Sequence, residues 1–285
     1  MSDRRSDKGP RNVRSKLDFA TVLGIILALG GILGGLVLEG GNLSEILAPT
    51  ALLIVLGGTV GAVLVTTPQD VLGRACRRIF EVFIEKSVST PDMIEELIGY
   101  AAKARRTGIV SLEFDAPNAS DPFLSKALTL AIDGTDIDEV RRMMELDITI
   151  AEQRGEAEAR VFEAAGGYSP TIGIIGAVLG LIQVMKNLAN IDEVGHGIAT
   201  AFVATIYGVG FANVFFLPAA AKIRARLETA AQLKEMMLEG VVAMVEGLNP
   251  KLVRAKLEAY HHRPEQPRLK DRDRDETGVK ETSRA

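Results

Sequence analysis

The sequence predicts an all-α integral membrane protein with four transmembrane helices and a large helical cytoplasmic domain between the second and the third. Three observations predict this class. Long uncharged stretches alternate with strongly charged ones in a chain of 285 residues. Each uncharged stretch reaches the roughly 20 apolar residues that are needed to cross a bilayer. The β-branched residues lie mainly inside these stretches, so almost no strand signal is left elsewhere.

The four predicted spans cover residues 19–38, 47–66, 164–185 and 194–221. At a rise of about 1.5 Å per residue, each is long enough for a hydrocarbon core of about 30 Å. The first span is too long for the apolar part of a signal peptide. It also lacks a small-x-small cleavage site followed by polar sequence. We therefore expect it to stay in the mature protein.

Lysine and arginine set the orientation, because they are enriched in cytoplasmic loops. The 39–45 loop has no basic residue, and the loop after the third span has Lys186. Both termini and the long 68–163 segment are therefore expected in the cytoplasm. The basic residues that predict this are Arg4, Arg5, Lys8, Arg11, Arg14, Lys16, Arg74, Arg77, Arg78, Arg154, Arg160, Lys222, Arg224 and Arg226.

Charge and helical periodicity divide the chain into six parts. We expect a basic cytoplasmic leader at 1–16, transmembrane helices at 17–67, a cytoplasmic helical domain at 68–163, transmembrane helices at 164–221, cytoplasmic helices at 222–260 and a charged, disordered tail at 261–285. Outside the spans, the expected helices cover 69–86, about 90–106 (ending near Gly108), 123–132, a stretch from 137 into the third span, 222–247 and about 250–260.

No enzyme motif is present. The sequence has no paired-histidine zinc pattern, no phosphate-binding loop with its lysine and no nucleophile elbow. Cys76 has no partner for a disulfide, and a formal net charge of −4 disfavours nucleic acid as the main partner. We therefore predict a protein that is not an enzyme and holds no metal or cofactor.

The polar content of the spans is informative. No Asp, Glu, Lys or Arg lies in the middle of a span, although intramembrane carboxylates are the usual proton or ion relays. The chain therefore cannot supply such a relay by itself. Polar side chains in the last two spans either line a wet path or bond back to their own helix. They are Thr171, Gln183, Thr200, Thr205, Tyr207 and Asn213.

Glycines and prolines add two further features. Glycines four residues apart let membrane helices approach closely, either within one chain or between subunits. Pro170 and Pro218 lie near the inner ends of the third and fourth spans, where they form either a hinge or passive kinks. The glycine pairs are Gly30/Gly34, Gly31/Gly35, Gly57/Gly61 and Gly176/Gly180.

Several motifs in this order resemble the flagellar motor stator subunits of the MotA/PomA family, part of the MotA/TolQ/ExbB superfamily. The resemblance covers about residues 17–260. The matching segments are 17–24 (LDFATVLG), 56–59 (LGGT), 104–113 (ARRTGIVSLE), 169–181 (SPTIGIIGAVLGL), 204–208 (ATIYG) and 213–218 (NVFFLP).

The resemblance implies a bacterial inner-membrane protein. Five copies would surround two copies of a single-span MotB- or PomB-type partner, which carries the ion-binding Asp and a peptidoglycan-anchoring domain. Ion flow would then turn the homopentamer and drive the rotor protein FliG. The missing relay carboxylate would thus arrive on the partner.

The resemblance also implies residue roles. Arg105, Arg106 and Glu113 match rotor-facing charges, although exposed charges are more often merely solvated. Pro170 and Pro218 match two functional prolines, assigned here as hinges.

The ion pathway and partner-facing surface is assigned to Pro170, Thr171, Ala177, Thr205 and Tyr207, with Thr205 matching the threonine that faces the partner's Asp. Sodium-driven members carry Thr where Ala177 lies, and proton-driven members carry Ala. A sodium ion needs several oxygen ligands, whereas a proton needs one acceptor. Proton coupling is therefore favoured, with sodium as the alternative because the chain otherwise resembles PomA.

Three other functions remain open. An ExbB/TolQ-type energiser of outer-membrane processes resembles a three-span protein with an outside N-terminus, which four spans and a basic leader disfavour. A self-contained transporter or channel would need intramembrane charges or a substrate pocket of its own. A passive membrane scaffold would need neither the polar face nor the matched prolines.

Overall fold

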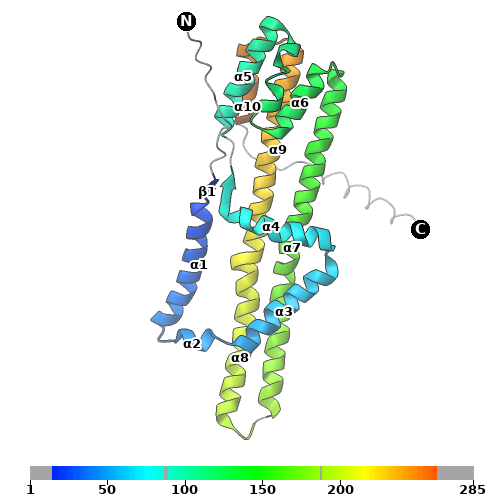
Figure 1. Ribbon diagram of the computed structural model, residues 1–285. Coiled ribbons are helices and arrows are strands. Elements are labelled where there is room, and N and C mark those ends of the chain that lie inside the picture. Colours follow the sequence, from blue (N-terminus) through cyan, green and yellow to red (C-terminus); the bar gives the residue numbers. More distant parts are fainter. Residues whose placement is uncertain (1–14, 87–88, 187, 262–285) are drawn as a thin grey trace, which may run out of the picture.

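The computed structural model describes residues 15–86, 89–186 and 188–261 (Figure 1). Most of the predicted leader and nearly all of the predicted tail lie outside these residues. The all-α class is confirmed, since four helical stretches are long and apolar enough to cross a membrane. They lie at Phe19–Leu38, Pro49–Thr66, Ile137–Lys186 and Ile191–Val245.

The described chain consists of helices joined by short connections, together with two three-residue strands. They are β1 (Ser15–Leu17), α1 (Phe19–Leu38), α2 (Leu43–Ile46), α3 (Pro49–Thr66), α4 (Gln69–Phe83), β2 (Ile84–Lys86), α5 (Thr90–Thr107), the 3-10 turns η1 (Ile109–Leu112) and η2 (Ala116–Asn118), α6 (Pro122–Ile132), α7 (Ile137–Lys186), α8 (Ile191–Gly210), the π-helical η3 (Phe211–Phe216), α9 (Leu217–Val245) and α10 (Pro250–His261).

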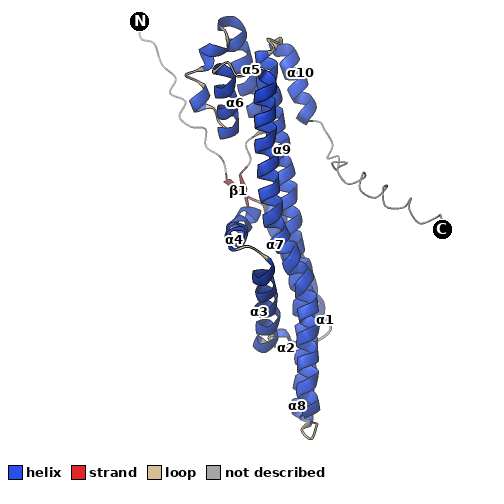
Figure 2. Cartoon of the chain, turned by 90° about the vertical axis from the view of Figure 1, so that its right-hand side faces the viewer, coloured by secondary structure: helices blue, strands red, loops and turns tan. Residues whose placement is uncertain are grey.

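Two long rods run side by side through the whole molecule (Figures 1 and 2). One is α7, whose 50 residues extend about 75 Å. The other is the succession of α8, η3 and α9. Asp136 begins α7, because its carboxylate accepts a hydrogen bond from the Asp138 amide at 3.0 Å. The prediction that this helix continues from 137 into the third span is confirmed. The boundaries expected at 163/164 and 221/222 thus fall inside continuous helices.

The two rods touch backbone to backbone within the membrane. A Cβ atom added to Gly208 would lie 2.6 Å from the Ser169 carbonyl oxygen, and one added to Gly173 would lie 2.9 Å from the Ala204 carbonyl oxygen. Glycine is required here because it alone lacks that atom. Of the four glycine pairs in the sequence, Gly176/Gly180 serves the same intramolecular crossing, since both meet α8.

The other glycine pairs remain uncovered. Nothing lies within 4 Å of a Cβ added to the paired glycines of α1 or α3. No residue of α1 is buried, and Figure 1 shows this helix beside the rods rather than between them. Its start is fixed by Asp18, whose carboxylate pairs with Lys222 at 2.6 Å and Arg226 at 3.0 Å on α9. The outer surface of α1 is therefore free for lipid or for other chains.

The cytoplasmic domain packs at one end of the rods (Figure 2). Its core takes one or more fully buried side chains from each of five helices. They include Leu97 of α5, Leu124 of α6, Met144 of α7, Met237 of α9 and Leu257 of α10. The rods therefore belong both to the membrane part and to the cytoplasmic core, which couples the two parts mechanically.

A short β-ladder joins β1, which comes just before α1, to β2, which directly follows α4. Ser15 pairs with Lys86 and Leu17 with Ile84, in antiparallel order. The predicted helix at 69–86 was therefore too long, because α4 ends at Phe83 and its last three residues form β2. Strands of three residues are too short to show an alternating pattern, so sequence periodicity could not find them.

We expect Gly208→Ala to lower the free energy of unfolding by about 1–3 kcal/mol, because the new methyl group would meet backbone that cannot move aside. The melting temperature of the detergent-solubilised protein measures this. Gly210→Ala is the control, since nothing lies within 4 Å of a Cβ at that position on the same rod. Equal melting temperatures for the two variants would contradict the close crossing.

Candidate ion-pathway and rotor-contact sites

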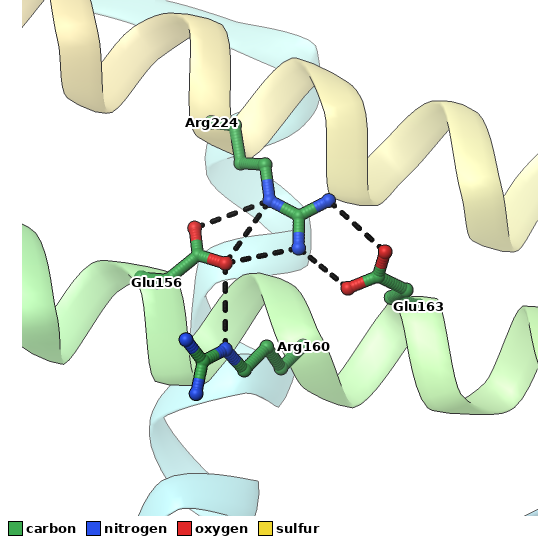
Figure 3. Close-up of polar contacts among 4 residues, drawn as sticks. All are labelled: Glu156, Arg160, Glu163 and Arg224. Carbon is green, nitrogen blue, oxygen red and sulfur yellow. Dashed lines mark hydrogen bonds and ion pairs between the residues drawn. The ribbon is translucent and has the colours of Figure 1, made fainter. Parts of the chain in front are cut away.

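Ion pairs join the two rods where the spans meet the helical domain. Arg224 of α9 lies between Glu156 and Glu163 of α7, at 2.9 Å and 2.5 Å, and Arg160 joins Glu156 at 3.5 Å (Figure 3). The hydrogen bonds that Arg224 donates to Glu156 and then to Glu163 raise the pKa of Arg224. The bond from Arg224 holds the pKa of Glu163 below its usual value. Arg224 therefore stays charged, and it links the rods at all physiological pH values.

A second set of pairs holds α4 across the rods. Glu158 of α7 is buried. It accepts a hydrogen bond from Arg78 at 2.8 Å and forms an ion pair with Arg74 at 3.4 Å. Figure 1 shows α4 lying across α7 and α9 at this level. A buried carboxylate needs such partners, because an unpaired buried charge is strongly destabilising. Ion pairs thus join α4, α7 and α9 at the boundary between the spans and the cytoplasmic domain.

Pro170 lies inside α7 without interrupting it. Proline has no N–H, so the Gly166 carbonyl loses its helical partner at this turn. The same turn packs on α8, where Gly208 comes close to both Ser169 and Pro170. The Ser169 hydroxyl is fully buried and has no hydrogen-bond partner among the described residues.

Pro218 lies at the start of α9, directly after the π-helical turn η3. Its missing N–H leaves the Val214 carbonyl without the usual partner, and a π-helical turn is a known way to accommodate such a defect. Gly166 of α7 lies against Leu217, since a Cβ added to this glycine would be 2.6 Å from the Leu217 side chain. The weakened turns of the two rods therefore face each other.

The two threonines of the predicted ion pathway bond back to their own helices. Thr171 is exposed, and its hydroxyl donates to the Tyr168 carbonyl at 2.7 Å. Thr205 is half-buried, and its hydroxyl donates to the Ala201 carbonyl at 3.4 Å. A hydroxyl used in this way still offers its lone pairs to a neighbour. Ala177 is half-buried on α7 and adds no polar group.

Tyr207 forms its hydrogen bonds within the chain. Its hydroxyl donates to the Ile46 carbonyl at 2.5 Å and accepts a hydrogen bond from the Ala48 amide at 3.4 Å. The ring packs against Phe211 and a small cluster that includes Val55 of α3. Tyr207 thus fixes α8 to the connection between α2 and α3.

The predicted rotor-facing charges lie together at the end of α5. Arg105 and Arg106 are exposed in its last turn, and Glu113 is exposed just beyond η1. Gly108 makes the turn between them with a φ of +84°, a conformation that favours glycine. In the described part of the chain, neither Arg105 nor Glu113 forms an ion pair.

Sequence reasoning missed two parts of this arrangement. The ion pairs of Arg224 and Glu158 join residues far apart in the chain, and no local spacing indicates them. The contact of Gly208 with the Pro170 turn was also missed, although two glycines flanking Val209 inside a span hinted at close packing. Within the described ranges, no group of three or more His, Cys, Asp or Glu side chains could hold a metal ion.

Comparison with known proteins identifies the family. The "Motility protein A N-terminal" family model matches residues 22–107, and the "MotA/TolQ/ExbB proton channel family" model matches residues 115–236. Motility protein A of Bacillus subtilis is 35% identical over 255 residues, which are 89% of this chain and 94% of that protein. The chain belongs to the motility protein A family of flagellar stator subunits.

Other relatives agree with this membership. Chemotaxis protein PomA of Vibrio alginolyticus is 30% identical and covers 86% of this chain and 95% of that protein. Among solved structures, C. jejuni MotAB matches with a TM-score of 0.82, at 30% identity, over 89% of this chain and 100% of that chain. The flagellar MotAB stator complex of Bacillus subtilis matches with a TM-score of 0.79, at 35% identity, over 85% and 95%.

The resemblance found in the sequence is thereby confirmed, and a stator role is favoured over the ExbB/TolQ-type energiser and over a self-contained transporter. The chain is a multi-pass membrane protein. Its family is described as a proton channel family. The role of such a family is ion transport rather than enzyme catalysis.

We expect Tyr207→Phe to lower the free energy of unfolding by about 1 kcal/mol, because it leaves the Ile46 carbonyl without its donor. Thermal unfolding in detergent measures the change. Tyr168→Phe is the control, since no hydrogen bond of its hydroxyl is found in the part of the chain that the structure describes. An unchanged melting temperature for Tyr207→Phe would leave this residue with a role at the partner-facing surface alone.

Proposed function

We propose that this stator subunit converts ion flow into torque together with a single-span MotB- or PomB-type partner, five copies to two, and that it drives the rotor protein FliG. One observation carries the proposal: no span has a carboxylate in its middle. A relay through these helices therefore needs a carboxylate from a second chain. The two matching solved structures are MotAB complexes, which supports a partner of this kind.

The partner-facing surface of this proposal contains Pro170, Thr171, Ala177, Thr205 and Tyr207. Thr171 is exposed, and the side chains of Ala177 and Thr205 are half-buried, so the single chain leaves them partly uncovered. The Tyr207 hydroxyl is already bonded, and this residue would hold α8 in position rather than touch the ion. The ion would pass between these residues and the carboxylate of the partner.

Protons are the proposed coupling ion, with sodium as the alternative. A sodium ion needs several oxygen ligands, and Ala177 supplies none. The hydroxyls of Thr171 and Thr205 are already directed at backbone carbonyls. The match to a proton channel family supports the same choice. Motility that persists in sodium-free medium and stops with a protonophore would establish proton coupling, whereas dependence on sodium would reverse it.

Pro170 and Pro218 would form the hinge between the spans and the cytoplasmic domain. Both remove a helical hydrogen bond, and Gly166 and Leu217 bring the two weakened turns into contact. The ion pairs of Arg224 lie on the cytoplasmic side of this level, so a tilt of one rod would carry the other with it. Arg105, Arg106 and Glu113 would then transmit the motion to the rotor.

The location in this proposal is the bacterial inner membrane, with both termini in the cytoplasm. Arg74, Arg78, Lys222, Arg224 and Arg226 all gather at one end of the spans, as expected for the cytoplasmic side. This orientation places the whole helical domain where a cytoplasmic rotor can reach it.

A pull-down of the tagged chain from native membranes, with mass spectrometry of the co-purifying proteins, tests the complex. We expect a single-span protein with a membrane Asp and a peptidoglycan-binding domain, at a ratio near five to two. A partner of the ExbD/TolR kind would instead indicate an energiser of the outer membrane. Isolation of the chain without any partner would leave the pathway without its carboxylate and would end the proposal.

Charge reversal tests the rotor contact. We expect Arg105→Glu and Glu113→Lys each to reduce swimming speed severalfold without lowering the amount of stator in the membrane, because both side chains are exposed. Swimming speed and membrane abundance are measured together. Glu246→Lys, an exposed charge beyond the end of α9, is the control. Normal swimming in both reversals would remove the rotor contact from this surface.

Pro170→Leu tests the hinge. Leucine restores the N–H that α7 lacks at this turn, so we expect normal assembly but motors that do not rotate. Tethered-cell rotation and membrane abundance are the measurements. Pro49→Ala is the control, because Pro49 lies at the start of α3, where no helical bond is missing. Normal rotation of Pro170→Leu motors would exclude the hinge.

A further inference from the structure

The loop after α5 is held rigidly against the cytoplasmic core. Leu112 and Ala116 are buried in that core at 0% and 2% exposure. Lys103 of α5 pairs with Asp115 at 2.5 Å, and the Asn118 side chain donates to the Phe114 carbonyl at 3.0 Å. Two short 3-10 turns and their backbone hydrogen bonds complete the loop. The exposed side chains of the loop are therefore carried by a backbone that is anchored to the core.

This rigid loop displays an aromatic side chain to water. Phe114 is 84% exposed, and Val110, one turn earlier, is 61% exposed. Among the described residues of the cytoplasmic domain, no other large apolar side chain is as exposed as Phe114. A phenylalanine in water forgoes about 2 kcal/mol or more of possible burial. Pre-organised aromatic side chains of this kind are typical anchors of protein interfaces.

The surroundings of Phe114 identify the kind of surface that would cover it. Glu113 is its neighbour in sequence, and Arg105 and Arg106 lie in the helical turn before the loop. Figure 1 shows α5 beside α6 and α10 at the end of the rods, away from the apolar spans. An apolar centre with a charged rim is the usual composition of a protein–protein interface.

We propose that Phe114, with Val110, is the apolar anchor of the rotor contact and inserts into an apolar recess of the rotor protein that is bordered by charged side chains of both signs. The charged border follows from charge complementarity, because neither Arg105 nor Glu113 forms an ion pair in the described chain. This inference rests on the proposed function, and it adds an apolar contribution to a contact otherwise assigned to charges.

The two contributions differ in their response to salt. Attraction between exposed charges weakens as ionic strength rises, whereas burial of an aromatic ring does not. Removing the ring therefore lowers the affinity by the same factor at every salt concentration. Reversing Arg105 instead changes the salt dependence itself.

The test measures binding of the full-length stator complex in nanodiscs to purified, immobilised FliG from 50 mM to 500 mM NaCl. We expect Phe114→Ala to weaken binding about tenfold at each salt concentration, with an unchanged slope against salt. Phe114→Leu should restore most of the affinity, because it keeps an apolar group. Leu252→Ala is the control, since Leu252 is 60% exposed on α10.

The outcomes separate this inference from the proposed function. Binding of Phe114→Ala within twofold of wild type, with Arg105→Glu weakened, would overturn the apolar anchor and leave the charged contact in place. Unchanged binding in both variants would overturn the rotor-contact surface itself. A loss of the oligomer in Phe114→Ala, seen by native mass spectrometry, would assign the ring to a neighbouring copy and would likewise overturn the proposal.

Discussion

The contact between the backbones of α7 and α8 at Gly173 and Gly208 fixes the rest of the structure. Helices in a bilayer gain no hydrophobic free energy from one another, so they associate through close packing. Two carbonyl oxygens lie where larger side chains would need space. The crossing keeps the two antiparallel rods side by side, and the cytoplasmic core lies at one end of them. It also sets the two proline turns at the same level.

On the side of the crossing that faces the helical domain, ion pairs hold the helices together. Arg224, Glu158 and Asp18 each lie in an ion pair with at least two partners on another helix. Such charged groups are tolerated where the chain leaves the hydrocarbon core of the bilayer, because a charge inside that core is energetically unfavourable. On the proposed function, the proline turns would bend while the ion pairs on their cytoplasmic side hold the rods together. The spans and the cytoplasmic domain would then move relative to one another without the rods separating.

The isolated chain also leaves surfaces open in a way that suits an assembly. The glycine pairs of α1 and α3 are uncovered, and no residue of α1 is buried. By contrast, Gly176 and Gly180 are already occupied within the chain. Small residues that a chain does not use itself are places where further helices approach. On the proposals above, the polar face without a carboxylate and the exposed Phe114 would each be covered by a different protein.

The sequence by itself determined that there are four spans and that α7 is continuous, because hydrophobic length and helical periodicity are local properties. The first span was predicted at 19–38 and lies there. Motif order also sufficed to indicate the stator family. Only the tertiary structure decided which glycines pack inside the chain, that the Tyr207 hydroxyl bonds to Ile46, and that Ser15 pairs with Lys86. These contacts join residues distant in the chain, and no local spacing encodes which distant partner fills a given space.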